Sequence, residues 1–85
     1  MYYFYILKSN KLKSCYYGFT NDLRRRFKEH NQGLSAYTKN GRPWKIAYYE
    51  AFSNKADAFE REKQMKRRKN SYTLLRRRII RSIEF

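Results

Sequence analysis

Residues of alternating hydrophobicity form three short stretches of the chain, and each stretch predicts a β-strand. The first two, Tyr2–Leu7 and Cys15–Phe19, are rich in aromatic residues and flank a polar, turn-rich segment at Ser9–Ser14. Aromatic and β-branched residues favour strands, and a polar segment between two such strands is typical of a hairpin. The third stretch, Trp44–Phe52, has a similar composition. The chain is therefore expected to open with a β-hairpin and to return to extended structure near its middle.

The alternation also predicts which side chains share a face, because successive residues of a strand point to opposite sides. In the first strand Tyr3, Tyr5 and Leu7 share one face, and in the second strand Tyr16 and Gly18 do so. In the third strand a strict alternation separates Ile46, Tyr48 and Glu50 from Ala47, Tyr49 and Ala51.

A helical periodicity follows the second strand and predicts a helix near Asp22–Asn31. The polar segment Thr20–Asp22 supplies N-cap side chains, and Gly33 suits a left-handed C-cap. The stripe that should face the sheet contains two apolar and two polar residues, in the order Leu23, Arg26, Phe27 and His30. A guanidinium and an imidazole on such a stripe point to a functional role.

Two more helices are predicted in the second half of the chain, after a loop at Gly33–Pro43. The first of these helices spans about Lys55–Arg68, and Glu62 lies at the edge of its apolar side. Its apolar residues are Ala58, Phe59 and Met65. The second begins after a cap at Asn70 or Ser71. Its apolar residues at helical spacing are Tyr72, Leu75, Ile79 and Ile83.

The order β-β-α-β-α-α suits a small α/β (α+β) domain, in which helices flank a three-stranded, mainly antiparallel sheet. A chain of 85 residues has room for one hydrophobic core, so we expect residues 1–85 to form a single domain. Cys15 is the lone cysteine and excludes an internal disulfide, which small secreted domains usually need. Together with an N-terminus unlike a signal peptide, this favours a cytoplasmic protein.

The charge balance is strongly basic, with 21 Lys and Arg against 7 Asp and Glu and a formal net charge of +14. Such a field attracts polyanions, and each phosphate neutralised by Lys or Arg adds affinity by releasing counterions. The chain has no apolar run of about 18 residues, which argues against a membrane partner. We therefore expect a nucleic acid, most of all DNA, as the partner. We expect no stable protein partner, and a monomer or a weak dimer.

These residues together resemble the GIY-YIG nuclease family. The resemblance is carried by the triplets Tyr3-Phe4-Tyr5 and Tyr16-Tyr17-Gly18, by Arg26 and His30 in the first helix, and by Glu62 in the second. Within the family the chain is most similar to the short, single-domain bacterial group called UPF0213 or URI-type. The resemblance implies a divalent-metal-dependent endonuclease that hydrolyses phosphodiester bonds of DNA. It further implies structure-selective or weakly sequence-specific cleavage in DNA repair or recombination.

The resemblance also implies a catalytic set, which consists of Tyr5, Tyr16, Arg26, His30 and Glu62. Glu62 corresponds to the glutamate that binds one Mg²⁺ or Mn²⁺ ion, and Mg²⁺ takes only one or two carboxylates besides its waters. Arg26 corresponds to the arginine on the scissile phosphate, and its fork of donors matches phosphate oxygens. Tyr5 and Tyr16 correspond to the tyrosines that orient the water and the phosphate. Either Tyr5 or His30 could be the base, and the sequence leaves this choice open.

A further group of side chains is expected to contact the substrate, namely Tyr37, Lys66, Arg24, Arg25, Arg67 and Arg68. Contacts of this kind position a nucleic-acid backbone and carry little sequence information. Two alternatives stay open: a catalytically idle, basic nucleic-acid-binding module of the same fold, and a small RNA-binding or ribosome-associated protein.

Overall fold

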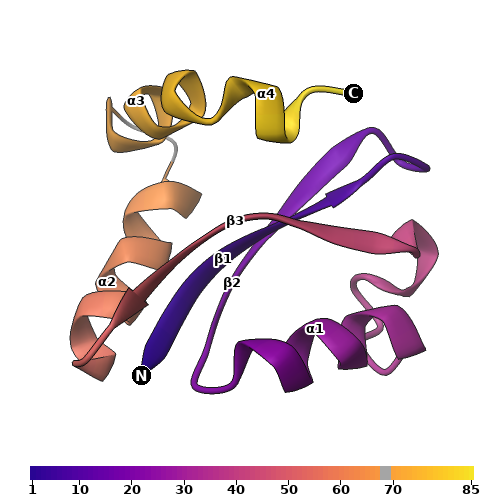
Figure 1. Ribbon diagram of the computed structural model, residues 1–85, viewed down its shortest axis with the longest axis horizontal. Helices are drawn as coiled ribbons and strands as arrows, with labels where there is room; N and C mark the ends of the chain where they lie inside the picture. The colour runs from indigo at the N-terminus through magenta and orange to yellow at the C-terminus, as the bar shows by residue number, and fades with distance from the viewer. Residues whose placement is uncertain (68–69) are drawn as a thin grey trace.

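A three-stranded antiparallel sheet forms the centre of the computed structural model, which describes residues 1–67 and 70–85 (Figure 1). The strands are β1 (Tyr2–Ser9), β2 (Ser14–Thr20) and β3 (Trp44–Phe52). Their order in the sheet is β2-β1-β3, so β1 is central and pairs antiparallel with both neighbours. The hairpin and the third strand expected from the sequence are confirmed.

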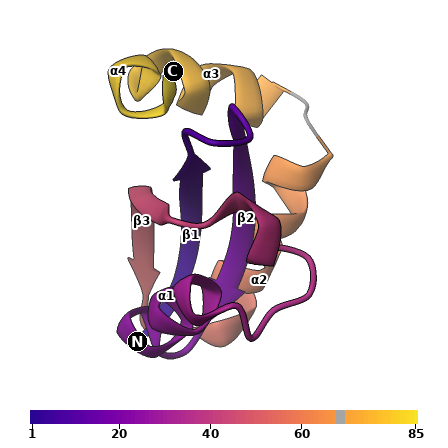
Figure 2. The ribbon, with the colours of Figure 1, turned by 90° about the vertical axis from the view of Figure 1, so that its right-hand side faces the viewer.

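Helices cover both faces of this sheet. Figure 1 shows α1 (Leu23–Gln32) on one side of it. The other helices, α2 (Lys55–Lys66), α3 (Asn70–Arg78) and α4 (Ile80–Ile83), form the opposite side and one end. Figure 2 shows α3 and α4 together beyond the ends of the strands. The fold class is therefore α+β, as predicted.

Each face of the central strand contributes to a separate hydrophobic core. Toward α1 the buried residues are Tyr5, Leu7 and Trp44. Toward the other helices they are Phe4, Ile6, Met65, Leu75 and Ile83. Because β1 is covered on both faces, consecutive residues of this strand are buried even though their side chains point to opposite sides. The sequence of β1 is therefore a continuous apolar run.

The ends of α1 follow the predicted capping chemistry. The Asp22 carboxylate accepts a hydrogen bond from the backbone N–H of Arg25 at 3.0 Å. Gly33 ends the helix with φ of 79°, a left-handed conformation that glycine adopts without steric cost. The loop predicted at Gly33–Pro43 contains a short 3₁₀ helix, η1 (Lys39–Gly41). These caps fix where the polar residues of the α1 stripe meet the sheet.

The last helical segment differs from the prediction. One helix was expected after Asn70, and the structure has two, because the backbone leaves the helical conformation at Ile79 (φ −115°, ψ 23°). The break redirects the chain, and Ile83 packs into the same core as Leu75. The observed order is β-β-α-β-α-α-α. In addition, α2 ends at Lys66, and the predicted helix end at position 68 lies outside the described residues.

The alternation predicted for the third strand is wrong, because β3 carries a bulge. Ile6 pairs with Tyr48 while Leu7 pairs with Ile46, so Ala47 is an extra residue in β3. Ala47 and Tyr48 both pack against the core on the α2–α4 side. After one inserted residue, each following side chain of the strand points to the opposite face from the one that strict alternation predicts. For this reason Ile46 lies on the same face as Tyr49.

None of the helices in the described part of the chain is long and apolar enough to cross a membrane.

Candidate active site

A buried hydrogen-bond chain joins β1, α1 and the loop before β3. The Tyr5 hydroxyl lies 2.9 Å from Nε2 of His30, and Nδ1 of His30 lies 2.7 Å from the Thr38 hydroxyl. The exposed fractions of Tyr5, His30 and Thr38 are 1%, 0% and 1%. The Thr38 carbonyl in turn accepts a hydrogen bond from Nε1 of Trp44 at 2.7 Å. Both nitrogens of the imidazole are therefore engaged, and the ring is fixed in its orientation.

Thr38 is a site residue that sequence reasoning missed. It was part of a predicted loop, where no periodicity indicates which side chains turn inward. Thr38 was assigned no role within that loop, whereas Tyr37 beside it was expected to contact substrate. In the structure Tyr37 is 92% exposed and Thr38 is buried.

Tyr16 packs against the outer side of the Tyr5–His30–Thr38 hydrogen-bond chain. Its ring centroid lies 5.1 Å from that of His30 and 6.5 Å from that of Tyr5. Unlike those two residues, Tyr16 is only half-buried. Gly18, two residues further along β2, makes room for the Tyr5 ring, since a Cβ at Gly18 would lie 2.4 Å from Cζ of Tyr5. Of the three ring side chains, Tyr16 is thus the one that reaches the surface.

Arg26 and Glu62 approach the same place from two helices. Nη1 of Arg26 donates to Oε1 of Glu29 at 3.1 Å, and both side chains are 31% exposed. Glu62 of α2 has a side chain 15% exposed and lies 3.7 Å from Nζ of Lys66. Arg26 and Glu62 both act electrostatically on the Tyr5 phenol. The structure therefore brings the five predicted catalytic residues into one neighbourhood.

Burial sets the protonation of the two innermost groups. It raises the pKa of Tyr5 to about 12, with Tyr16 adding to the rise and Arg26 opposing it. Burial, together with the positive charge of Arg26, lowers the pKa of His30 to about 4. At neutral pH Tyr5 therefore keeps its proton and His30 is a neutral imidazole.

We expect the stability of the protein to fall between about pH 6.5 and pH 4 because His30 is buried uncharged. In this window the unfolded chain binds a proton at its histidine, whose ordinary pKa is 6.5, while the folded chain does not. Stability then decreases as the pH falls, and the full difference in the free energy of unfolding is about 3 kcal/mol. Urea unfolding at several pH values, compared with His30→Gln, measures it. An NMR titration that gave His30 a pKa near 6.5 in the folded protein would contradict this expectation.

The carboxylate of Glu62 is an oxygen ligand of the kind that suits a single hard cation. In the part of the chain that the structure describes, no group of three or more His, Cys, Asp and Glu side chains could hold a metal. Mg²⁺ commonly binds through one or two carboxylates and keeps its other positions for water and substrate phosphates. Glu62, a carboxylate at the edge of the cluster, fits that requirement.

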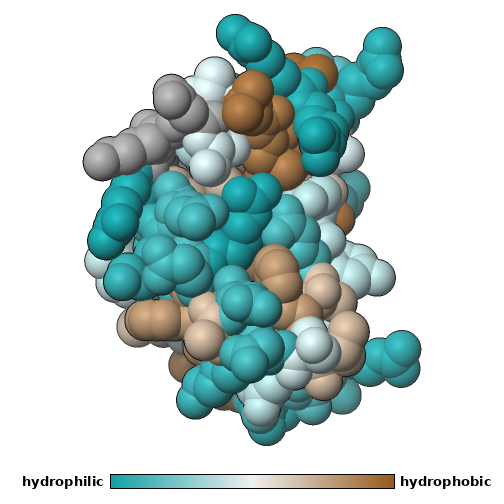
Figure 3. All heavy atoms as spheres, turned by 90° about the vertical axis from the view of Figure 1, so that its left-hand side faces the viewer, coloured by the Kyte–Doolittle hydropathy of each residue, from teal (hydrophilic) through white to brown (hydrophobic). Residues whose placement is uncertain are grey.

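The remaining residues predicted to contact substrate lie at the surface, and these are Lys66, Arg24, Arg25, Arg67 and Tyr37. Position 68, the sixth of them, lies outside the described residues. Figure 3 shows that the face carrying α2 is largely hydrophilic across its middle. Exposed cations of this kind can reach a polyanion without a change in the fold.

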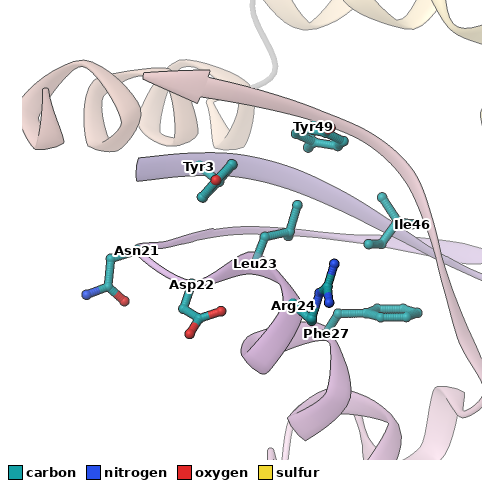
Figure 4. A pocket seen from close by; sticks show the side chains of 8 residues that line it. All are labelled: Tyr3, Asn21, Asp22, Leu23, Arg24, Phe27, Ile46 and Tyr49. Carbon is teal, nitrogen blue, oxygen red and sulfur yellow. The ribbon is translucent and has the colours of Figure 1, made fainter. Parts of the chain in front are cut away.

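A larger and more open hollow than the surroundings of Tyr5 lies elsewhere. It has a volume of about 460 Å³ between α1 and β3, with the rings of Tyr3, Tyr49 and Phe27 along its walls (Figure 4). None of the five predicted catalytic residues lines it. The chemistry of the side chains, and not the size of the cavity, therefore identifies the candidate active site.

Comparison with known proteins gives one family. A family model for the GIY-YIG catalytic domain matches residues 1–76. UPF0213 protein CPE1444 of Clostridium perfringens is 47% identical over 68 residues, which cover 79% of this chain and 72% of that protein. UPF0213 protein lwe0147 of Listeria welshimeri is 40% identical over 80 residues, 88% of each chain. UPF0213 protein YazA of Bacillus subtilis is 43% identical over 67 residues, 78% of this chain and 67% of that protein. No solved structure matches the chain.

Proposed function

Because the chain belongs to the GIY-YIG nuclease family, we propose that it is a divalent-metal-dependent DNA endonuclease. The family implies endonuclease activity on nucleic acid, and its nucleases generally depend on a divalent metal. The proposal goes further in naming DNA as the substrate and one Mg²⁺ or Mn²⁺ ion as the cofactor. It also includes structure-selective or weakly sequence-specific cleavage in repair or recombination, by a cytoplasmic protein that acts as a monomer or weak dimer.

One observation supports this proposal above the others. Two phenols, an imidazole, a guanidinium and a carboxylate from β1, β2, α1 and α2 approach one another around Tyr5. Packing of a hydrophobic core does not require these polar and charged groups. Hydrolysis of a phosphodiester requires an oriented water, donors for the phosphate oxygens and a counter-charge for the developing negative charge.

Glu62 would hold the divalent cofactor through its carboxylate, and an ion held there would supply positive charge to offset the negative charge that develops during phosphodiester hydrolysis. Lys66 lies 3.7 Å from the Glu62 carboxylate, which is 15% exposed and so still accessible from solvent.

Arg26 contacts the scissile phosphate in the proposed mechanism. Its guanidinium presents a planar fork of donors that matches two phosphate oxygens. The hydrogen bond from Arg26 to Glu29 at 3.1 Å holds one arm of the fork, so less side-chain entropy is lost when the substrate binds. Glu29 thus positions Arg26 from one turn further along α1.

Tyr16 orients the attacking water in this mechanism, and Tyr5 and His30 support the position of Tyr16. The sequence left Tyr5 and His30 as alternatives for the base. Both are almost completely buried, and Tyr5 has a raised pKa and keeps its proton. We therefore propose that these two residues hold the cluster in place, and that the half-buried Tyr16 makes the contact with water.

A nicking assay tests the proposal. Purified protein is incubated with supercoiled plasmid and with branched DNA, with Mg²⁺ or Mn²⁺ and with a chelator. The proposal predicts nicking that requires the metal. A protein that binds DNA but nicks none of these substrates would instead be the catalytically idle module of the same fold.

Replacement of Arg26 by lysine should reduce kcat/KM by about 10- to 100-fold. The charge is kept and the bidentate fork is lost, and a hydrogen bond to a charged group contributes about 1.5–3 kcal/mol. Arg81→Lys, on the exposed surface of α4, is the matched control and should cleave at the wild-type rate. If Arg26→Lys also cleaves at that rate, Arg26 does not contact the scissile phosphate.

A further inference from the structure

A second hollow, of about 390 Å³, opens beside Arg26 between the ends of the strands and the start of α2. Its lining consists of Tyr2, Phe19, Thr20, Asn21, Arg26 and Lys55. We propose that it binds a phosphodiester of the same nucleic-acid strand, next to the scissile one, with Lys55 as the contact residue. This inference rests on the proposed function, and nothing in the sequence had singled out Lys55.

The charges of the lining favour an anion. Two of the six lining residues are cations, Arg26 from α1 and Lys55 from α2, and none of the six is an acid. The lining also contains two aromatic residues, Tyr2 and Phe19, and the polar residues Thr20 and Asn21. A phosphate with its attached sugar combines a charge with a less polar surface and suits this lining.

The position of Lys55 on α2 links the hollow to the candidate active site. Lys55, Phe59 and Glu62 are spaced i, i+4 and i+7 and so lie along one side of the helix. With a rise of about 1.5 Å per residue, Lys55 is roughly 10 Å along the helix axis from Glu62. That separation corresponds to a neighbouring position on an extended strand rather than to the scissile phosphate itself.

A packed aromatic pair fixes this side of the helix against the sheet. The rings of Phe19 and Phe59 meet edge to face with centroids 5.8 Å apart. Phe59 lies between Lys55 and Glu62 on α2, so the contact orients both of them with respect to β2. Arg26 of α1 lines the same hollow as Phe19 and Lys55. A strand that places one phosphate at Arg26 and Glu62 therefore continues past Lys55.

The first test combines substitutions in the protein with neutral phosphates in the substrate. Each phosphodiester near the cleaved bond is replaced in turn by an uncharged methylphosphonate, and kcat/KM is measured for wild type and Lys55→Gln. At one position next to the cleaved bond, the neutral group should slow wild type several-fold and have no further effect on Lys55→Gln. Lys55→Arg should restore the sensitivity, and Lys45→Gln on β3 should behave as wild type. If Lys55→Gln is as sensitive as wild type at every position, the inference is wrong.

A binding measurement decides the inference even if no cleavage is found. Fluorescence anisotropy with the same oligonucleotides and a chelator gives the dependence of affinity on salt. Lys55→Gln should reduce the slope of log K against log salt by about 0.7 to 0.9, the value for one phosphate contact, while Lys45→Gln leaves it unchanged. Equal slopes for wild type and Lys55→Gln would overturn the phosphate site. Absence of cleavage with a reduced slope would overturn only the proposed nuclease function.

Discussion

Replacement of Glu62 by glutamine should reduce metal-dependent cleavage by about three orders of magnitude or more and leave the protein folded. The amide has the same shape as the carboxylate but lacks the charge that binds a divalent cation. Loss of the cation removes several kcal/mol of transition-state stabilisation, and each 1.36 kcal/mol is about a tenfold change in rate. Glu62 and Lys66 form an i, i+4 pair within one helix, and a pair of this kind contributes only about 0.5 kcal/mol or less to stability.

Glu60→Gln is the matched control for this experiment. Glu60 lies on the same helix, pairs with Lys63 at 4.0 Å and has a side chain 55% exposed. It should cleave like wild type, and its thermal unfolding should match that of Glu62→Gln. The cleavage rate of Glu62→Gln is also measured at increasing concentrations of Mg²⁺ and Mn²⁺. Recovery of the rate at high metal concentration indicates weakened metal binding, and no recovery indicates loss of an electrostatic effect that added metal does not replace. Should Glu62→Gln nick DNA as well as Glu60→Gln, Glu62 is not the metal ligand.

Replacement of Tyr16 by phenylalanine should reduce kcat/KM by about 100-fold or more with little loss of stability. The hydroxyl is proposed to orient the attacking water, and poor positioning of a reacting group costs about that much in rate. The ring itself packs against His30, Tyr5 and Trp44, and phenylalanine retains that packing. Steady-state cleavage and urea unfolding are measured on the same preparations.

Tyr5→Phe should give a different result, and the difference tests the arrangement. It removes the partner of Nε2 in the fully buried His30. An unsatisfied buried polar group costs about 1–3 kcal/mol of stability, so this variant should be less stable as well as less active. Tyr49→Phe, on β3, should change neither property. If Tyr16→Phe cleaves normally, or if Tyr5→Phe is as stable as wild type, the proposed roles are incorrect. These roles are contact with the water for Tyr16 and support of the cluster for Tyr5.

Much of the fold follows from local pattern. The three strands, α1 with its caps at Asp22 and Gly33, and the apolar residues Met65 and Leu75 could all be predicted, because they depend on periodicity and capping. The break at Ile79 could not be predicted, because the helical spacing of the apolar residues continues through it. The bulge in β3 likewise has no local signature, since it depends on the pairing with β1.

The candidate site divides in the same way. The sequence by itself determined the candidate residues: Arg26 and His30 interrupt an apolar stripe, and Glu62 borders another, so each is conspicuous against its periodic surroundings. Only the tertiary structure decided how these candidates are arranged. It buries Tyr5 and His30 against Thr38, leaves Tyr16 half-buried, and places Lys55 and Arg26 in the lining of one hollow. Periodicity records which side of its own element a residue faces, whereas burial and partners depend on elements far apart in the chain that meet only when it folds.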